Sequence, residues 1–227
     1  MMKWMAVFFL VLCAPAQAWE CKYDKRIEQA LNVSGSDLLK VAAAAGDLEI
    51  TGESGRSEVE IRGRVCVSEE EWLDEATIEI STGEVASIAV VLPDSNGWSL
   101  WGNRYAYIDL ELLVPNGLDL DVKDSSGDIE IENVAAVRLK DSSGDIEIND
   151  VAGTVEIKDS SGDIRVQDVA GDFTVHSDSS GQIRGSDIEG NVLVENDSSG
   201  DIRFTNVGRN VTCLLYTSDA ADDPTLV

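Results

Sequence analysis

Apolar and polar residues alternate through the second half of the chain, in short stretches separated by polar turns. After each Asp-Ser-Ser-Gly turn comes Asp-Ile-Glu-Ile or a variant of it. This alternation places the isoleucine on one face of a strand and the charged residues on the other. A second alternating stretch precedes each turn. The pattern therefore predicts two short strands per repeat and one buried column, formed by Ile129, Ile146, Ile164, Ile183 and Ile202.

The Asp-Ser-Ser-Gly turn occurs five times, and successive copies are 17, 18, 19 and 19 residues apart. A second corner, an Asn or Asp followed by Val or Ile, closes each repeat, and such residues suit turns because they tolerate positive φ. A meander of hairpins would use similar strands, but identical columns at every second strand are typical of stacked coils. We therefore expect an all-β, parallel, β-helix-like solenoid with five regular coils of 17–19 residues across residues 117–212.

The two ends of the chain differ from this pattern. Residues 1–18 combine Lys3, an apolar run and the small-residue ending Ala-Gln-Ala at Ala18, which predicts a cleaved secretory signal. The run is shorter than the roughly 20 residues of a membrane span, so we expect a periplasmic, secreted or cell-surface protein without one. Residues 213–227 resemble the conceptual translation of an adapter used in sequencing libraries, and we treat them as an artefactual tail.

Residues 19–116 predict a less regular N-terminal part of the same solenoid. The stretch from Gly46 to Glu53, "GDLEITGE", is a degenerate copy of the repeat strand. The segment around Trp98 and Trp101 is longer and rich in aromatic residues, which predicts wider coils with a protruding loop. No segment combines helix caps with a 3.6-residue apolar stripe.

These motifs give the chain a family resemblance. Gly46–Glu53, the Val-Pro-Asn-Gly turn ending at Gly117 and the Ser-Gly-Asp-Ile units resemble a bacterial family of unknown function described as putative adhesins. The resemblance covers about residues 30–212. It implies a single-stranded right-handed β-solenoid that is exported and has no established enzymatic activity. A fold does not by itself define a function, so the adhesin description is an expectation.

The acidic composition narrows the range of partners. The formal net charge is −26, and losing Lys3 with the signal would make it −27. Such a surface repels nucleic acid and anionic lipid, so neither is expected as a partner. Because 43% of the residues are hydrophobic and alternate with polar ones, we expect a packed core rather than disorder.

Two of the four cysteines belong to the predicted mature domain. Cys13 leaves with the signal and Cys213 lies in the excluded tail, so Cys21 and Cys66 remain. An even pair in an exported protein predicts a disulfide. It would close a loop of roughly 45 residues and stabilise the fold by about 3–4 kcal/mol.

The repeat also predicts stacked acidic side chains. A column would form from Asp124, Asp141, Asp159, Asp178 and Asp197, and a second row from Asp128, Asp145, Asp163 and Asp201. Like charges about 4–5 Å apart, the distance between stacked strands, repel by about 1 kcal/mol even in water. A row of Ca²⁺ ions between the carboxylates is therefore physically reasonable. The alternative is that each Asp accepts backbone N–H groups of its own turn. Gln182 interrupts the second row and no known calcium-loop motif occurs. Both observations favour hydrogen bonds within each turn over calcium binding.

Two further groups are candidates for partner recognition. The outward positions of the second strand change sign along the stack, running Glu130, Glu147, Arg165, Arg184 and Arg203. They form either a solvated face balanced by nearby carboxylates or a contact for an anionic partner, and the solvated face is the favoured reading. The aromatic residues Trp98, Trp101, Tyr105 and Tyr107 would either bind a sugar or protein or cover an edge of the solenoid, and packing is the favoured reading.

Catalysis has little support in the sequence. His176 is the only histidine, and no Gly-x-Ser-x-Gly, phosphate loop or His-Glu-x-x-His occurs. Carboxylates alone can cleave glycosides, so a carbohydrate-active β-helix enzyme is the alternative. Here the acidic residues recur with the period of the repeat, which indicates a structural role instead. We therefore expect a binding, scaffolding or adhesin-like module of the cell envelope, with an envelope protein or glycan as partner and no cofactor apart from candidate Ca²⁺.

Overall fold

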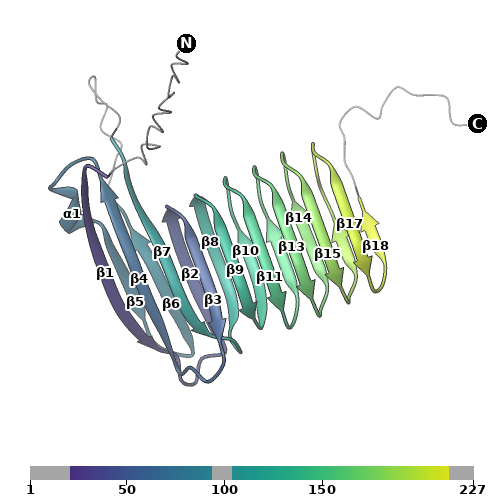
Figure 1. Ribbon diagram of the computed structural model, residues 1–227, viewed down its shortest axis with the longest axis horizontal. Coiled ribbons are helices and arrows are strands. Elements are labelled where there is room, and N and C mark those ends of the chain that lie inside the picture. The colour runs from purple at the N-terminus through teal and green to yellow at the C-terminus, as the bar shows by residue number, and fades with distance from the viewer. Residues whose placement is uncertain (1–20, 94–103, 215–227) are drawn as a thin grey trace, which may run out of the picture.

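The computed structural model describes residues 21–93 and 104–214. These residues form two nine-stranded, mostly parallel sheets that face each other, with one helical turn, α1 (Trp72–Glu75). The strands lie side by side along one long axis, from β1 at one end to β18 at the other (Figure 1). The predicted all-β class and the parallel stacking are confirmed, and the right-handed winding stays a prediction.

Both sheets have a spatial order that departs from the chain order only near the N-terminal end. Sheet A contains, in spatial order, β1 (Tyr23–Asn32), β4 (Glu58–Val67), β7 (Ala106–Pro115), β3 (Leu48–Glu53), β9 (Ile129–Val134), β11 (Ile146–Val151), β13 (Ile164–Val169), β15 (Ile183–Ile188) and β17 (Ile202–Val207). Sheet B contains β18 (Val211–Cys213), β16 (Val192–Val194), β14 (Phe173–Ser177), β12 (Val155–Lys158), β10 (Ala136–Lys140), β8 (Asp119–Ser126), β2 (Leu38–Ala45), β6 (Val85–Val91) and β5 (Thr77–Ser81).

In the regular part, each coil gives one strand to each sheet, and equivalent residues pair in register. Ile146 of β11, for example, pairs with Ile129 on one side and Ile164 on the other. These isoleucines are no more than 2% exposed, and they pack between the sheets with the inward residues of sheet B, such as Ile157. The predicted isoleucine column therefore exists. Its last member, Ile202, is partly exposed in the final coil.

The Asp-Ser-Ser-Gly corner depends on glycine for two reasons. The glycine of each corner has a φ between +128° and +136°, a backbone conformation that other residues rarely adopt. A Cβ on Gly144 would also lie only 1.8 Å from the carbonyl oxygen of Gly127 in the preceding coil. Glycine therefore permits both the turn and the close stacking of successive corners.

The opposite corner uses a single left-handed residue in each coil. Its φ lies between 53° and 57° at Asn133, Asp150, Asp168, Asp187 and Asn206. Asn and Asp are the non-glycine residues that tolerate this conformation best, because their short polar side chains bond locally. The Asn-or-Asp corner predicted from the repeat is thus present in all five coils.

The N-terminal part differs from the wider coils that we expected. β4 pairs antiparallel with both β1 and β7, and β5 pairs antiparallel with β6. In addition, β2 and β3 lie between the β6–β7 coil and the β8–β9 coil, although they precede β6 in the chain. β1, β4 and β7 have ten residues each and lack the repeat's corner signals, so the chain continues straight where a regular coil would turn.

Candidate functional site

The outer face of sheet A carries one continuous row of charged side chains across all nine strands. We call it the charge row, and strand pairing places its members side by side in the order Glu28, Arg62, Glu111, Glu49, Glu130, Glu147, Arg165, Arg184 and Arg203. The predicted change of sign along the stack is therefore real. It separates an acidic middle from a run of three arginines at the C-terminal end.

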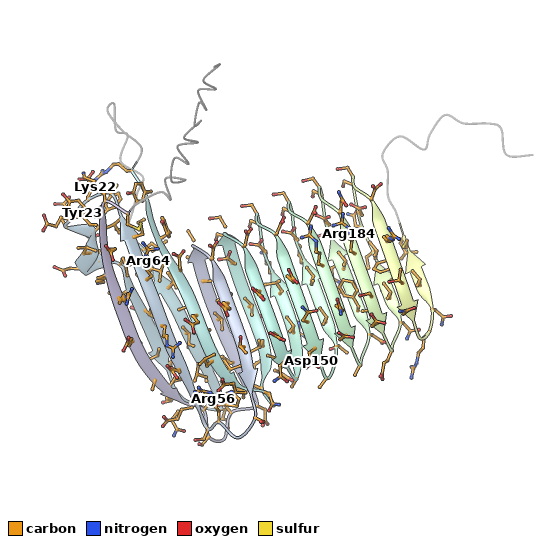
Figure 2. The ribbon with its side chains drawn as sticks, viewed as in Figure 1. Lys22, Tyr23, Arg56, Arg64, Asp150 and Arg184 are labelled. Atoms are coloured by element: carbon orange, nitrogen blue, oxygen red, sulfur yellow. A yellow bond between two sulfur atoms is a disulfide. The ribbon has the colours of Figure 1, made fainter. Side chains whose placement is uncertain are left out.

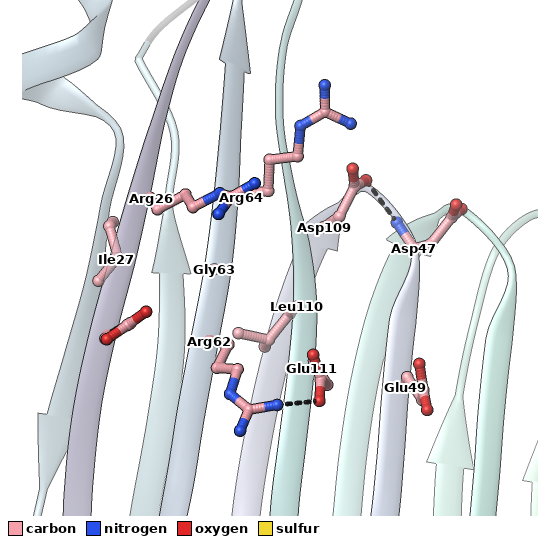
Figure 3. Close-up of a pocket in the computed structure, with 11 residues that line it drawn as sticks. Arg26, Ile27, Asp47, Glu49, Arg62, Gly63, Arg64, Asp109, Leu110 and Glu111 are labelled. Atoms are coloured by element: carbon pink, nitrogen blue, oxygen red, sulfur yellow. Dashed lines mark hydrogen bonds and ion pairs between the residues drawn. The ribbon is translucent and has the colours of Figure 1, made fainter. Parts of the chain in front are cut away.

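At the N-terminal end, the charge row borders a hollow of about 390 Å³. Arg62 Nη1 lies 2.6 Å from Glu111 Oε1, and Arg26 and Arg64 lie farther along the strands, above this pair in the view (Figure 3). Asp109 lies on the far wall, where it accepts the backbone N–H of Asp47 at 3.3 Å. Burial raises the pKa of Asp109 above its ordinary value. Arg62 and Glu111 thus neutralise one another, whereas Arg26 and Arg64 form no ion pair among the described residues.

The arginine strip, defined as Arg165, Arg184 and Arg203, occupies the other end of the charge row. It borders a second hollow, of about 400 Å³, whose wall continues with a row of uncharged polar side chains: Asn149, Gln167, Ser186 and Thr205. Figure 2 shows Arg184 near one edge of the stack and Asp150 at the opposite edge. The strip therefore combines cations with hydrogen-bonding groups on an otherwise acidic protein.

The three arginines are not equally neutralised. Arg165 Nη2 lies 2.7 Å from Asp163 Oδ2, and its Nη1 lies 3.6 Å from Asp145 Oδ2. Arg184 reaches the same Asp163 oxygen at 3.4 Å and also donates to Gln182. Among the described residues, Arg203 forms no ion pair. Positive charge that no neighbour balances thus increases toward the C-terminal end of the strip.

Beside the charge row runs an outer aspartate row, in which each carboxylate accepts the backbone N–H of the next coil. Asp145 Oδ1, for example, accepts the N–H of Asp163 at 2.9 Å, and Asp163 Oδ1 accepts that of Gln182 at 3.0 Å. Members of this row are Asp109, Asp47, Asp128, Asp145 and Asp163. The predicted second row is thus a ladder of hydrogen bonds between coils. Gln182 still donates its N–H to Asp163, but among the described residues no side-chain hydrogen bond links it to Asp201, so the ladder ends at Gln182.

The five turn aspartates form a separate inner aspartate column, which lies inside the corner. Its members, with their exposed fractions, are Asp124 (7%), Asp141 (2%), Asp159 (2%), Asp178 (1%) and Asp197 (6%). A lysine precedes each of Asp124, Asp141 and Asp159, and these lysines pair in register, so the three aspartates lie at equivalent positions of neighbouring coils. Asp178 pairs directly with Asp197. The predicted stacking is therefore confirmed, and the side chains point into the protein.

The inner aspartate column is poorly satisfied by protein groups. Neither carboxyl oxygen of Asp124, Asp141 or Asp159 has a hydrogen-bond partner among the described residues. The amides of the following serines lie close enough to lower the pKa of these groups, but none reaches the geometry of a full hydrogen bond. Asp178 and Asp197 each accept one N–H, from Ser180 and Ser199, at 3.2 Å.

Burial shifts the ionisation of this column. It is the largest cause that raises the pKa of Asp124 and of Asp159, each to about 6, and neighbouring column carboxylates raise them further. Burial also raises the pKa of Asp141 and Asp178. At neutral pH the column therefore holds carboxylates that are costly to keep charged.

Other predicted site residues have structural contacts. Cys21 and Cys66 form the predicted disulfide, with their Cα atoms 5.5 Å apart. Tyr107 Oη lies 3.6 Å from Cys21 Sγ, and Tyr105 Oη accepts the N–H of Lys22 at 3.1 Å. These two tyrosines thus secure the start of the described chain. Trp98 and Trp101 lie outside the described residues, so partner binding by the four aromatic residues stays a prediction.

The described residues offer no assembled catalytic or metal centre of a familiar kind. Within residues 21–93 and 104–214, no three His, Cys, Asp or Glu side chains converge as a metal site would require. His176 Nδ1 lies 2.9 Å from Glu195 Oε2 and its Nε2 lies 3.5 Å from Glu156 Oε2, on an exposed face. In the same ranges, no helix is long and apolar enough to cross a membrane.

The sequence pattern missed the N-terminal half of the charge row. Glu28, Arg62 and Glu111 join it through antiparallel pairing, which no repeat announces. Only Glu49 carried a usable signal, because it lies in the degenerate copy at Gly46–Glu53.

Fold and surface together define an all-β module of two stacked sheets with a charged, solvent-facing side. Residues 27–172, more than half of the chain, match the family described as Toastrack DUF4097, and the chain therefore belongs to this family. The resemblance to bacterial putative adhesins is confirmed. A comparison with curated proteins finds no match.

Solved structures with a similar arrangement include a putative cell adhesion protein from Clostridium sporogenes ATCC 15579, at 11% identity and a TM-score of 0.49 over 84% of this chain and 100% of that one. A putative adhesin from Bacteroides fragilis NCTC 9343 has 13% identity and a TM-score of 0.42 over 84% and 95%. A putative lipid binding protein from Parabacteroides distasonis ATCC 8503 has 13% identity and a TM-score of 0.37 over 85% and 95%. Likeness at this level carries no argument about binding.

Proposed function

We propose that this chain is an exported, adhesin-like binding module of the cell envelope, and that its arginine strip binds acidic glycan. The observation that carries the proposal is the strip itself: three arginines in register on a protein of net charge −26. Guanidinium groups bind carboxylates through paired hydrogen bonds, which suits uronic-acid sugars. The adjoining Gln167, Ser186 and Thr205 offer hydrogen bonds to sugar hydroxyls.

The location outside the cytoplasm rests on two features of the chain. The Cys21–Cys66 disulfide is typical of oxidising compartments. The pattern of residues 1–18 matches a secretory signal. A periplasmic or cell-surface module would meet envelope glycans directly.

The electrostatics favour a local contact over general attraction. The protein as a whole repels polyanions at long range, whereas Arg203 and its neighbours act within about 10 Å at moderate salt. We therefore expect short acidic oligosaccharides to bind better than long polyanions, nucleic acid included. Binding should weaken as salt rises, because the arginines are solvent-exposed.

A carbohydrate-active enzyme is the second candidate, and one observation speaks for it. The hollow beside Arg62 contains carboxylates outside the regular repeat, and burial raises the pKa of one of them, Asp109, as a general acid requires. However, Glu111 is already paired with Arg62, and Asp109 accepts a backbone N–H. We therefore propose binding without turnover. Release of new reducing ends from the oligosaccharides would show cleavage and would favour the enzyme instead.

Oligogalacturonate binding measured by isothermal titration calorimetry, with neutral gluco-oligosaccharides of equal length alongside, tests the proposal. The variant Arg184→Gln/Arg203→Gln should bind oligogalacturonate at least about tenfold more weakly, since each lost charged hydrogen bond costs about 1.5–3 kcal/mol. The matched control Arg56→Gln/Arg138→Gln removes the same charge from exposed positions outside the strip and should bind as the wild type does. Equal losses in both variants, or no acidic-sugar binding by the wild type, would contradict the proposal.

A further inference from the structure

The inner aspartate column is the feature that neither the fold nor the proposed function explains. A corner of this kind needs a polar side chain that bonds its own backbone, and Asp178 and Asp197 do so. Asp124, Asp141 and Asp159 do not, although each is at least nine-tenths buried. Six buried carboxyl oxygens thus lie in three successive coils without a protein partner.

The outer aspartate row provides an internal comparison. There, equally stacked carboxylates accept N–H groups at 2.9–3.3 Å and are exposed or half-buried. Buried polar groups in folded proteins are nearly always paired, and buried charges are paired or bound to metal ions. The following serine amides offset part of the charge of the three inner carboxylates, and no cationic side chain pairs with them among the described residues.

We propose that the inner aspartate column binds calcium ions in the two gaps between Asp124, Asp141 and Asp159. Strands in a sheet are spaced about 4.8 Å apart, so an ion midway between two stacked carboxylate oxygens lies about 2.4 Å from each. That distance is within the 2.3–2.6 Å range of calcium–oxygen bonds, whereas magnesium requires about 2.0–2.1 Å. The repeat of the coils thus suits calcium and is too wide for magnesium.

The composition of each gap fits a calcium site of modest affinity. Two carboxylates border a gap, which agrees with the finding that no three acidic, His or Cys side chains converge among the described residues. Asp141 borders both gaps. Ser125 and Ser142 directly follow Asp124 and Asp141 in the chain, and their carbonyls accept serine hydroxyls of the next coil at 3.2 Å, so backbone oxygens bridge the same pairs of coils. Calcium accepts such carbonyls and water together with carboxylates.

The experiment uses the full chain after chelator treatment, with calcium chloride and magnesium chloride as the two probes. Isothermal titration calorimetry and the thermal midpoint are measured up to about 10 mM, which covers the 10⁻⁴–10⁻³ M range of extracellular calcium modules. Calcium should bind and raise the midpoint, and magnesium should do so at least about tenfold more weakly. No calcium-dependent heat and no rise in the midpoint would overturn the proposal.

Variants then locate the site. Asp141→Asn keeps the side-chain shape, removes the carboxylate that both gaps share and should weaken calcium binding at least about tenfold. The control Asp150→Asn/Asp168→Asn removes charge at the opposite, exposed corner, where Asn occurs naturally at the same φ, and should bind calcium as the wild type does. Equal calcium affinity in both variants would overturn the proposal. The proposal would also be overturned if Asp141→Asn raised the thermal midpoint both with and without calcium. The native carboxyl group would then be neutralised by a proton rather than by calcium.

Circular dichroism checks that Asp141→Asn folds, and Asp124→Asn, which borders one gap only, replaces it if it does not. Asp124→Asn should lower the number of bound ions rather than abolish binding, and an unchanged number would count against the assignment. Oligogalacturonate binding by the same variants keeps this test separate from the arginine strip. A failure of either proposal therefore leaves the other standing.

Discussion

The regular coils from β8 to β17 and the N-terminal end from β1 to β7 build the same two sheets by different means. The coils stack in parallel register, and the backbone pairing of sheet A is repeated from coil to coil. The N-terminal end pairs three ten-residue strands antiparallel and closes them with a disulfide and a set of individual ion pairs. In the coils, one type of contact therefore recurs from coil to coil. At the N-terminal end, each stabilising contact occurs once.

This difference decides where chemistry can accumulate. In the coils, one residue choice in the repeat becomes a column, so that an Asp at the corner gives five buried carboxylates and an Arg gives a strip. At the N-terminal end the same face alternates in sign, and Arg62 lies between Glu28 and Glu111. In the charge row, cations thus follow one another directly only where the chain repeats itself.

The largest effect should come from removing the covalent link of the N-terminal end. Cys21→Ser/Cys66→Ser opens a loop of 45 residues and should lower the free energy of unfolding by about 4 kcal/mol. Urea denaturation followed by circular dichroism measures this loss. The coils have no covalent link to lose, so their stability should not change. The N-terminal end should therefore unfold at a lower urea concentration than the coils, and unfolding should occur in two steps. Cys213→Ser, which removes a free cysteine, is the control, and an unchanged midpoint in the double variant would contradict the role of the disulfide.

A glycine substitution should affect the coils more than the N-terminal end. Gly144→Ala puts a Cβ 1.8 Å from the Gly127 oxygen and forces an unfavourable φ of 134°, which should cost about 3 kcal/mol. Gly55→Ala at the N-terminal end also has a positive φ, 80°, but its Cβ would meet nothing within 4 Å. It should cost only about 1 kcal/mol. Equal losses, again from urea denaturation, would show that stacking distance does not constrain the corner.

The same contrast explains how much of the molecule the sequence could predict. In the coils, alternation predicts the strands, and the Asp-Ser-Ser-Gly spacing predicts which residues stack, so the isoleucine and aspartate columns were both foreseen. At the N-terminal end, the pairing of β4 with β7 brings Arg62 beside Glu111 across 49 residues. No local signal encodes such a pairing, because strand order depends on the whole sheet.

The direction of the turn aspartates was the harder question. Asp124 follows Val122 with one residue between them and therefore shares its inward face. Extending the strand period into the corner would have revealed this. The hydrogen bonds of the outer aspartate row, in contrast, depend on how coils approach one another, which one sequence cannot show.

The smallest effect concerns His176, which joins three neighbouring coils on the outer face of sheet B. Its hydrogen bond to Glu195, and then that to Glu156, raises the pKa of the imidazole above its ordinary value of 6.5. A pKa raised in the folded state stabilises the protein fully below about pH 6.5, and this contribution is lost as pH rises through the folded pKa. His176→Gln should therefore lower stability at pH 5.5, by less than about 1 kcal/mol for so exposed a pair, and have no effect from this source at pH 8.5. Because His176 is the only histidine, its titration by NMR in untagged protein is unambiguous, and a measured pKa at or below 6.5 would refute the contact between coils.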